Sequence, residues 1–210
     1  MTQLTAAALW LNTVFAGFDE SIMVAIHQLY LMAGNFFTPF MEFISFLGDD
    51  GICLIVFSVI LILFKKTRRF GTAMLLGLAI GALFTNLWLK VVIARPRPYT
   101  NEGSVFQQIW IVMGQHMESD KSFPSGHTTA AFAAMVPVFI LGNKKISWTA
   151  LIFAVLMGIS RIYLAVHYPS DVLGGIIVGT VAGIIGAIIA NMLPKKYYEF
   201  PVQKGGAHLC

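Results

Sequence analysis

Long apolar stretches without charged side chains constrain the fold of this chain more than any other feature. Phe70–Leu89 and Val172–Leu193 contain no charged residue. Each has about the 20 residues that an α-helix needs to cross the hydrocarbon core of a bilayer. Only 11% of all residues are charged, against about 25% in a typical soluble domain. The sequence therefore predicts an all-α fold, a polytopic membrane helix bundle.

Five apolar segments are expected to form transmembrane helices. They span residues 51–64, 70–90, 127–142, 146–163 and 171–193. In the N-terminal region, residues 1–48, Asp19 and Glu20 follow a short apolar run. We expect interfacial amphipathic helices over Asp19–Leu47, and it stays open whether this N-terminal segment supplies a sixth transmembrane helix. The length fits a single membrane-embedded domain over residues 1–210. The two cysteines, Cys53 and Cys210, indicate no disulfide framework.

The distribution of charge predicts which helix ends face the cytoplasm. One set of helix ends carries most of the fourteen basic residues. These are Lys65, Lys66, Arg68, Arg69, Lys144, Lys145, Lys195, Lys196 and Lys204. Because cytoplasmic loops are enriched in Lys and Arg, we expect this face to be cytoplasmic in a multi-pass protein of the cell membrane.

The opposite, outer face collects nearly all of the ten acidic residues. These are Asp19, Glu20, Glu42, Asp49, Asp50, Glu102, Glu118, Asp120 and Asp171. Five basic residues are also expected there, against the rule: Lys90, Arg95, Arg97, Lys121 and Arg161. The presence of cations at this face requires a local explanation, and binding of an anionic substrate is one. Arg95 alone is interpreted as a side chain that snorkels to the interface.

The stretch Phe123-Pro124-Ser125-Gly126-His127 precedes an apolar run and is suited to holding an oxyanion. The first N–H groups of a helix have no intrahelical partner, and the helix dipole adds positive charge there. Gly126 would let a phosphate approach the backbone closely. Ser125 adds a hydroxyl donor, and His127 can carry a proton near neutral pH. Taken alone, the pentapeptide fits an ordinary turn with a helix cap equally well.

Two further clusters are expected at the same membrane face. Lys90 and Arg97 are seven residues apart, so two helical turns would align them, whereas Pro96 and Pro98 forbid a regular helix beyond this point. The second cluster is Ser160-Arg161, His167 and Asp171 around a tight hairpin. Together the three clusters supply what phosphoryl transfer without a metal requires. Cations neutralise the phosphoryl oxygens, one histidine attacks while a carboxylate fixes its tautomer, and another histidine protonates the leaving oxygen.

These three clusters resemble the signature of a known family. Lys90-x6-Arg97-Pro98, Pro124-Ser125-Gly126-His127 and Ser160-Arg161-x5-His167-x3-Asp171 are similar to the three motifs of the type 2 phosphatidic acid phosphatase superfamily. The resemblance covers roughly Lys90–Gly175, in the family's order. It implies a six-helix membrane core, from which only the weak first helix departs.

The resemblance also implies a role for each motif residue. His167 would be the nucleophile that forms a phosphohistidine, and Asp171 would orient it. His127 would be the general acid for the leaving group and then the base that activates water. The phosphate oxygens would be bound by Lys90, Arg97, Arg161, Ser125 and Gly126.

A site at the membrane–water boundary suits a lipid phosphate or diphosphate whose chains stay in the bilayer. By family analogy we expect undecaprenyl pyrophosphate, with phosphatidylglycerophosphate or phosphatidate as alternatives. The outer loop residues Phe106, Ile109, Trp110 and Ile111 are expected to form either an interfacial lid or an ordinary aromatic belt.

Other functions fit the sequence less well. Haloperoxidases that use vanadate share the motifs but are soluble. In a transporter or channel we would expect ionisable residues inside the helices, and the five predicted helices have none in their interiors. A catalytically idle lipid-phosphate binder would not need the nucleophile. We expect no metal, because no carboxylate or Cys/His cluster has suitable spacing, no cofactor and no nucleic-acid partner. The sequence does not indicate the oligomeric state.

Overall fold

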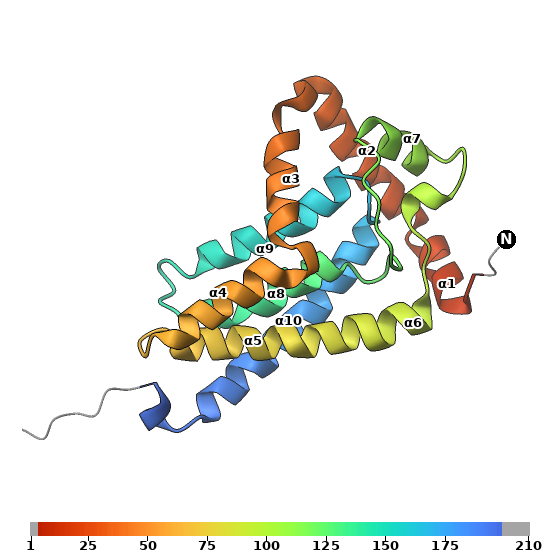
Figure 1. Cartoon of the computed structure of the whole chain (residues 1–210). Helices are drawn as coiled ribbons and strands as arrows, with labels where there is room; N and C mark the ends of the chain where they lie inside the picture. Colours follow the sequence, from red (N-terminus) through yellow and green to blue (C-terminus); the bar gives the residue numbers. More distant parts are fainter. Residues whose placement is uncertain (1–3, 199–210) are drawn as a thin grey trace, which may run out of the picture.

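The computed structural model describes residues 4–198, and over this range the chain consists of helices and the loops between them, without a β-strand (Figure 1). Two residues named above, Lys204 and Cys210, lie outside the described residues. The helices are α1 Ala6–Val14, α2 Ala16–Ala33, α3 Thr38–Leu47, α4 Ile52–Leu63, α5 Arg68–Ala82, α6 Lys90–Ile93, α7 Val105–Val112, α8 Gly126–Leu141, α9 Trp148–Tyr163 and α10 Pro169–Met192. A π-helical stretch, Leu83–Leu89, joins α5 to α6.

The five predicted membrane segments are all helical, at α4, α5 with the π-helical stretch, α8, α9 and α10. By length and apolar character, Arg68–Thr100 and Pro169–Met192 can each cross a bilayer. Two bent pairs, α1 with α2 and α3 with α4, would raise the number to four if each were one span. The helices α8 and α9 have 16 residues each, somewhat short of a full span. Five crossings therefore stay a prediction.

The N-terminal region differs from the predicted interfacial helices. A helix already begins at Ala6, where the Thr5 hydroxyl accepts a hydrogen bond from the Ala8 N–H. It bends by 61° into α2, which begins at Ala16 rather than at Asp19. Asp19 is buried instead of facing water at the outer surface. Its charge must therefore be compensated inside the protein.

Small residues let α10 pack closely against α5 and α8, as Figure 1 shows near the middle of α10. A Cβ on Gly179 would lie 2.5 Å from the Thr129 carbonyl oxygen of α8. A Cβ on Gly186 would lie 2.4 Å from the Ala73 carbonyl oxygen of α5. Real Cβ atoms do not approach this closely, so these glycines serve backbone contact between helices.

The chain leaves the helical conformation shortly before the first predicted motif ends. Ala94 takes a left-handed backbone conformation (φ 50°), and Arg97 follows in an extended one. The predicted stop by Pro96 and Pro98 is therefore confirmed. The predicted alignment of Lys90 and Arg97 over two helical turns is wrong, because the helix ends at Ile93. The two side chains nevertheless meet, through a shared partner described below.

Candidate active site

The three predicted motifs meet at one end of the bundle, around a cavity of about 290 Å³. The cavity wall includes Lys90, Arg97, Gly126, His127 and His167. Its other walls are largely apolar and come from α4, α5 and α8. The cavity therefore has a cationic end and an apolar end.

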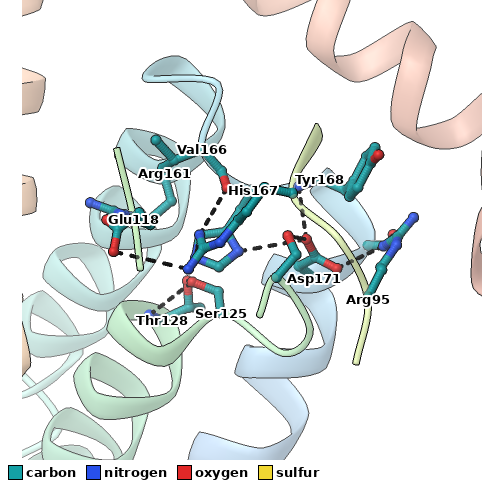
Figure 2. A network of polar contacts seen from close by, with 12 residues as sticks. Arg95, Glu118, Ser125, Thr128, Arg161, Val166, His167, Tyr168 and Asp171 are labelled. Atoms are coloured by element: carbon teal, nitrogen blue, oxygen red, sulfur yellow. Dashed lines mark hydrogen bonds and ion pairs between the residues drawn. The ribbon is translucent and has the colours of Figure 1, made fainter. Parts of the chain in front are cut away.

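His167 lies at the centre of the polar network in Figure 2, in the turn between α9 and α10. It is 1% exposed. Its Nε2 lies 2.9 Å from Arg97 Nη1, and its Nδ1 lies 3.5 Å from Asp171 Oδ2 without a hydrogen bond. Burial first, and then the charges of Arg97, Arg161 and Lys90, hold the pKa of His167 well below its ordinary value. The imidazole is therefore neutral at pH 7, and its Nε2 lone pair can accept from Arg97.

Asp171 lies in the first turn of α10 and is fully buried. The sequence Tyr168-Pro169-Ser170-Asp171 begins this helix because proline suits the first helical position and an acid suits the first turn. The Asp171 carboxylate accepts from the Tyr168 N–H at 2.9 Å, from Ser122 Oγ at 2.5 Å and from Arg95 Nη1 at 2.7 Å. Three donors thus fix the carboxylate beside His167.

Ser125 caps α8 and sets the direction of His127. Its hydroxyl accepts from the Thr128 N–H at 3.4 Å and from Thr128 Oγ1 at 3.0 Å (Figure 2). This is ordinary N-cap geometry, and it starts the helix at Gly126. Ser125 is fully buried, whereas Gly126 and His127 reach the cavity wall. A Cβ on Gly126 would lie 3.4 Å from Lys90 Nζ, so the glycine backbone adjoins one of the cations.

His127 Nε2 lies 3.2 Å from Asp49 Oδ1, a contact that the motifs do not contain. Asp49 follows α3, and the preceding Gly48 packs beside the ring. A Cβ on Gly48 would lie 2.8 Å from His127 Cδ2. The segment between α3 and α4 therefore shapes the position of the second histidine.

Two loop carboxylates occupy the cationic end of the cavity. Asp120 pairs with both Lys90 and Arg97, and Glu118 pairs with Arg161. Burial alone would raise the pKa of Asp120, but the hydrogen bonds and charges of Lys90 and Arg97 outweigh it and lower that pKa. Sequence reasoning missed these pairs and placed both acids only on the outer face. An arriving anion has to replace the two carboxylates.

Arg95 does not snorkel, so its interpretation from the sequence was wrong. Its side chain is 1% exposed and forms ion pairs with Asp19 and Asp171. The guanidinium also stands 3.9 Å from the centre of the Tyr168 ring. An acid within an apolar segment, such as Asp19, is the signal that could have predicted a buried cation as its partner.

The predicted lid residues lie on α7, and most of them are packed against the protein. Ile109 is buried, Trp110 stacks on Tyr99 at 4.6 Å between ring centres, and Phe106 meets the Tyr168 ring edge-on. Of the four predicted lid residues, only Ile111 is exposed. The structure does not support a free lid at this position, because α7 packs in one hydrophobic core with the turn between α9 and α10.

Residues suited to hold a metal ion are not grouped anywhere between residues 4 and 198: no three His, Cys, Asp or Glu side chains come close enough together. The charged groups of the cavity wall instead include Lys90, Arg97, Asp120 and Glu118. Arg161 is buried in the last turn of α9, outside the wall, and pairs with Glu118. The arrangement can bind an anion and offers a neutral imidazole as a nucleophile.

The chain is similar to several known proteins. The family model described as PAP2 superfamily matches residues 70–195. The chain is 32% identical to undecaprenyl-diphosphatase BcrC of Bacillus subtilis, over 67% of this chain and 70% of that protein. It is 27% identical to lipid A 4'-phosphatase of Bacteroides thetaiotaomicron, over 86% and 84%.

A solved structure also resembles this one over most of its length. It is the crystal structure of a transmembrane PAP2 type phosphatidylglycerolphosphate phosphatase from Bacillus subtilis, with a TM-score of 0.67 and 28% identity. The match covers 90% of this chain and 92% of the other. The likeness therefore includes helices that precede the first motif.

Proposed function

The chain belongs to the PAP2 superfamily, which includes lipid phosphatases, and from this premise we propose that it hydrolyses a lipid-linked phosphate or diphosphate through a phosphohistidine on His167. One observation carries the proposal. His167, His127, Lys90 and Arg97 line one cavity, and the carboxylate of Asp171 lies beside His167 Nδ1.

In the proposed mechanism, the substrate's phosphate displaces Glu118 and Asp120 from the cations. Lys90, Arg97 and Arg161 then bind its oxygens, with the Gly126 N–H beside them. His167 Nε2 attacks phosphorus as Arg97 Nη1 moves from this nitrogen to a phosphoryl oxygen. Asp171 stabilises the positive charge that develops on the ring.

His127 completes both half-reactions. It donates a proton to the leaving oxygen as the phosphorus–oxygen bond breaks, which releases the lipid alcohol or lipid monophosphate. It then takes a proton from the water that attacks the phosphohistidine, and inorganic phosphate leaves. Asp49, 3.2 Å from His127 Nε2, supports the ring while it carries the proton.

The apolar end of the cavity supports a lipid substrate. Ile55, Ala79 and Ala82 line it and are exposed, so an acyl or prenyl chain could lie against them. We favour undecaprenyl pyrophosphate, since BcrC is an undecaprenyl-diphosphatase of 32% identity. Phosphatidylglycerophosphate and phosphatidate are the alternatives.

A substrate panel tests this function. The purified protein in detergent should release phosphate fastest from undecaprenyl pyrophosphate, and more slowly from phosphatidylglycerophosphate, phosphatidate and lipid A. The activity should persist in EDTA, because cationic side chains neutralise the phosphate. Vanadate should inhibit it, because a trigonal-bipyramidal oxyanion resembles the transferring phosphoryl group. No release from any of these lipids would refute the function. Loss on chelation that Mg²⁺ restores would refute the mechanism.

We also propose that the site faces the outside of the cell membrane, because Lys and Arg concentrate at the other helix ends. Ser119 and Asn143 are both exposed, near the site and at the opposite end of α8 respectively. In a variant without native cysteines, Ser119→Cys should react with a membrane-impermeant thiol reagent added to intact cells, and Asn143→Cys should react only after lysis. The reverse pattern would turn the site toward the cytoplasm.

A further inference from the structure

Two buried charged residues lie beside the site without reaching its cavity. Arg95 is 1% exposed and Asp19 is 2% exposed. Neither belongs to the cavity wall, and their polar groups are occupied by hydrogen bonds with each other, Asn12, Ser170 and Asp171. We therefore assign neither of them a contact with a substrate phosphate. A buried charge is costly unless it is paired and hydrogen-bonded. The partners of these two side chains therefore indicate what their charges do.

All three guanidinium nitrogens of Arg95 donate hydrogen bonds. Nη1 donates to Asp171 Oδ1 at 2.7 Å, Nη2 donates to Asp19 Oδ2 at 2.8 Å, and Nε donates to Asn12 Oδ1 at 2.8 Å. Figure 2 shows Asp171 between Arg95 and His167. The fixed fork of an arginine thus links two carboxylates in one orientation.

Asp19 also holds the start of α10. Its Oδ1 accepts from the Ser170 N–H at 2.7 Å, and its Oδ2 accepts from Ser170 Oγ at 2.7 Å. The Ser170 N–H is one of the helix-start donors that need a partner outside the helix. Asp19 therefore connects α2 to the same helical turn that carries Asp171.

The charges of this cluster explain why two acids share one arginine. If Arg95 faced Asp171 alone, the pair would be neutral and would offer little attraction to a developing imidazolium. Asp19 brings a second carboxyl group. With both acids ionised, the cluster of Asp19, Arg95 and Asp171 carries one net negative charge beside His167. The carboxylate of Asp171 is then fixed in place without being neutralised.

We propose that Asp19 and Arg95 are positioning residues, which hold the Asp171 carboxylate at 3.5 Å from His167 Nδ1 and keep its charge available to the nucleophile. This inference rests on the proposed function of His167. It makes the N-terminal helices part of the reacting unit, although the family model matches only residues 70–195.

The test compares turnover with anion binding. Asp19→Asn should lower kcat roughly 10–100-fold, the range for partners that orient a reacting group. It should leave the inhibition constant of inorganic phosphate unchanged, because the cations that bind this ground-state anion are intact. Glu20→Gln is the matched control: Glu20 is exposed on the same helix, and its loss changes the net charge equally but should change neither quantity.

A double-mutant comparison separates positioning from general structural support. In an Asp171→Asn background, Asp19→Asn should cause no further loss of kcat, because Asp19 acts through Asp171. If Asp19→Asn yields no folded protein, Arg95→Lys serves instead: it keeps a cation but loses the fork, and should lower kcat with inorganic phosphate binding retained.

Three outcomes would overturn the inference: full activity of the Asp19 or Arg95 variant, an equal weakening of inorganic phosphate binding and kcat, or a further loss in the Asp171→Asn background. If the wild-type protein and the Asp19→Asn variant are equally active, this inference is refuted and the proposed function stands. A wild-type protein without turnover removes the proposed function and this inference with it.

Discussion

His167→Ala is expected to abolish phosphate release from every substrate, a loss on the order of 10⁶-fold as for other removed nucleophiles. Without the imidazole no phosphoenzyme forms, whichever group leaves. Rapid-mixing experiments with p-nitrophenyl phosphate provide the measurement, and this variant should show no burst of nitrophenol. The variant should still bind inorganic phosphate, since Lys90, Arg97 and Arg161 remain.

His116→Ala is the matched control for this substitution. His116 lies outside the cavity wall and pairs with Glu42 at 3.4 Å, so its removal should leave turnover unchanged. A nitrophenol burst from His167→Ala would exclude this residue as the nucleophile.

His127→Ala is expected to show a loss that depends on the leaving group. An alkoxide from a lipid phosphomonoester is strongly basic, so loss of the general acid should slow this reaction roughly 10²–10⁴-fold. Nitrophenolate needs a proton much less, and so does the lipid phosphate that leaves a diphosphate. Phosphorylation by p-nitrophenyl phosphate should therefore persist.

The same variant also lacks the base that activates water. Hydrolysis of the phosphohistidine should then limit turnover, and His127→Ala should give a nitrophenol burst followed by a slow steady state. A burst from His167→Ala and none from His127→Ala would mean that the two histidines exchange roles.

Local signals in the sequence predict the start of α8 and the end of α6 well. A serine followed by glycine marks an N-cap, and prolines stop a helix whatever the rest of the protein does. The observed helix begins at Gly126, one residue before the predicted 127, and the chain leaves helix at Ala94. Such signals depend on a few neighbouring residues, so they can be recognised without knowledge of the tertiary structure.

Contacts between distant residues could not be predicted in the same way. Asp19 and Arg95 are 76 positions apart, and His127 and Asp49 are 78 apart. Nothing in the residues around Arg95 distinguishes a buried ion pair from a solvated side chain at an interface. The choice depends on whether an acid from another helix arrives there, which only the packing of α2 against α10 decides.

The number of membrane crossings shows a related limit. Apolar composition predicts where helices form, and all five segments are helical. Whether a helix crosses a bilayer depends also on its length and bends, and α3 meets α4 at 41° while α8 has 16 residues. Composition alone carries no information about such a bend.

The apolar wall between α4, α5 and α8 affects how the reaction rate should depend on the amount of lipid substrate. Ile55, Ala79 and Ala82 line the cavity and are exposed, so a lipid that follows this wall would reach the cations by sideways diffusion within its leaflet. Encounters are then confined to two dimensions. The rate should follow the mole fraction of the lipid in its leaflet rather than its amount per volume of buffer, and an inert lipid added at constant bulk substrate would slow the reaction by surface dilution.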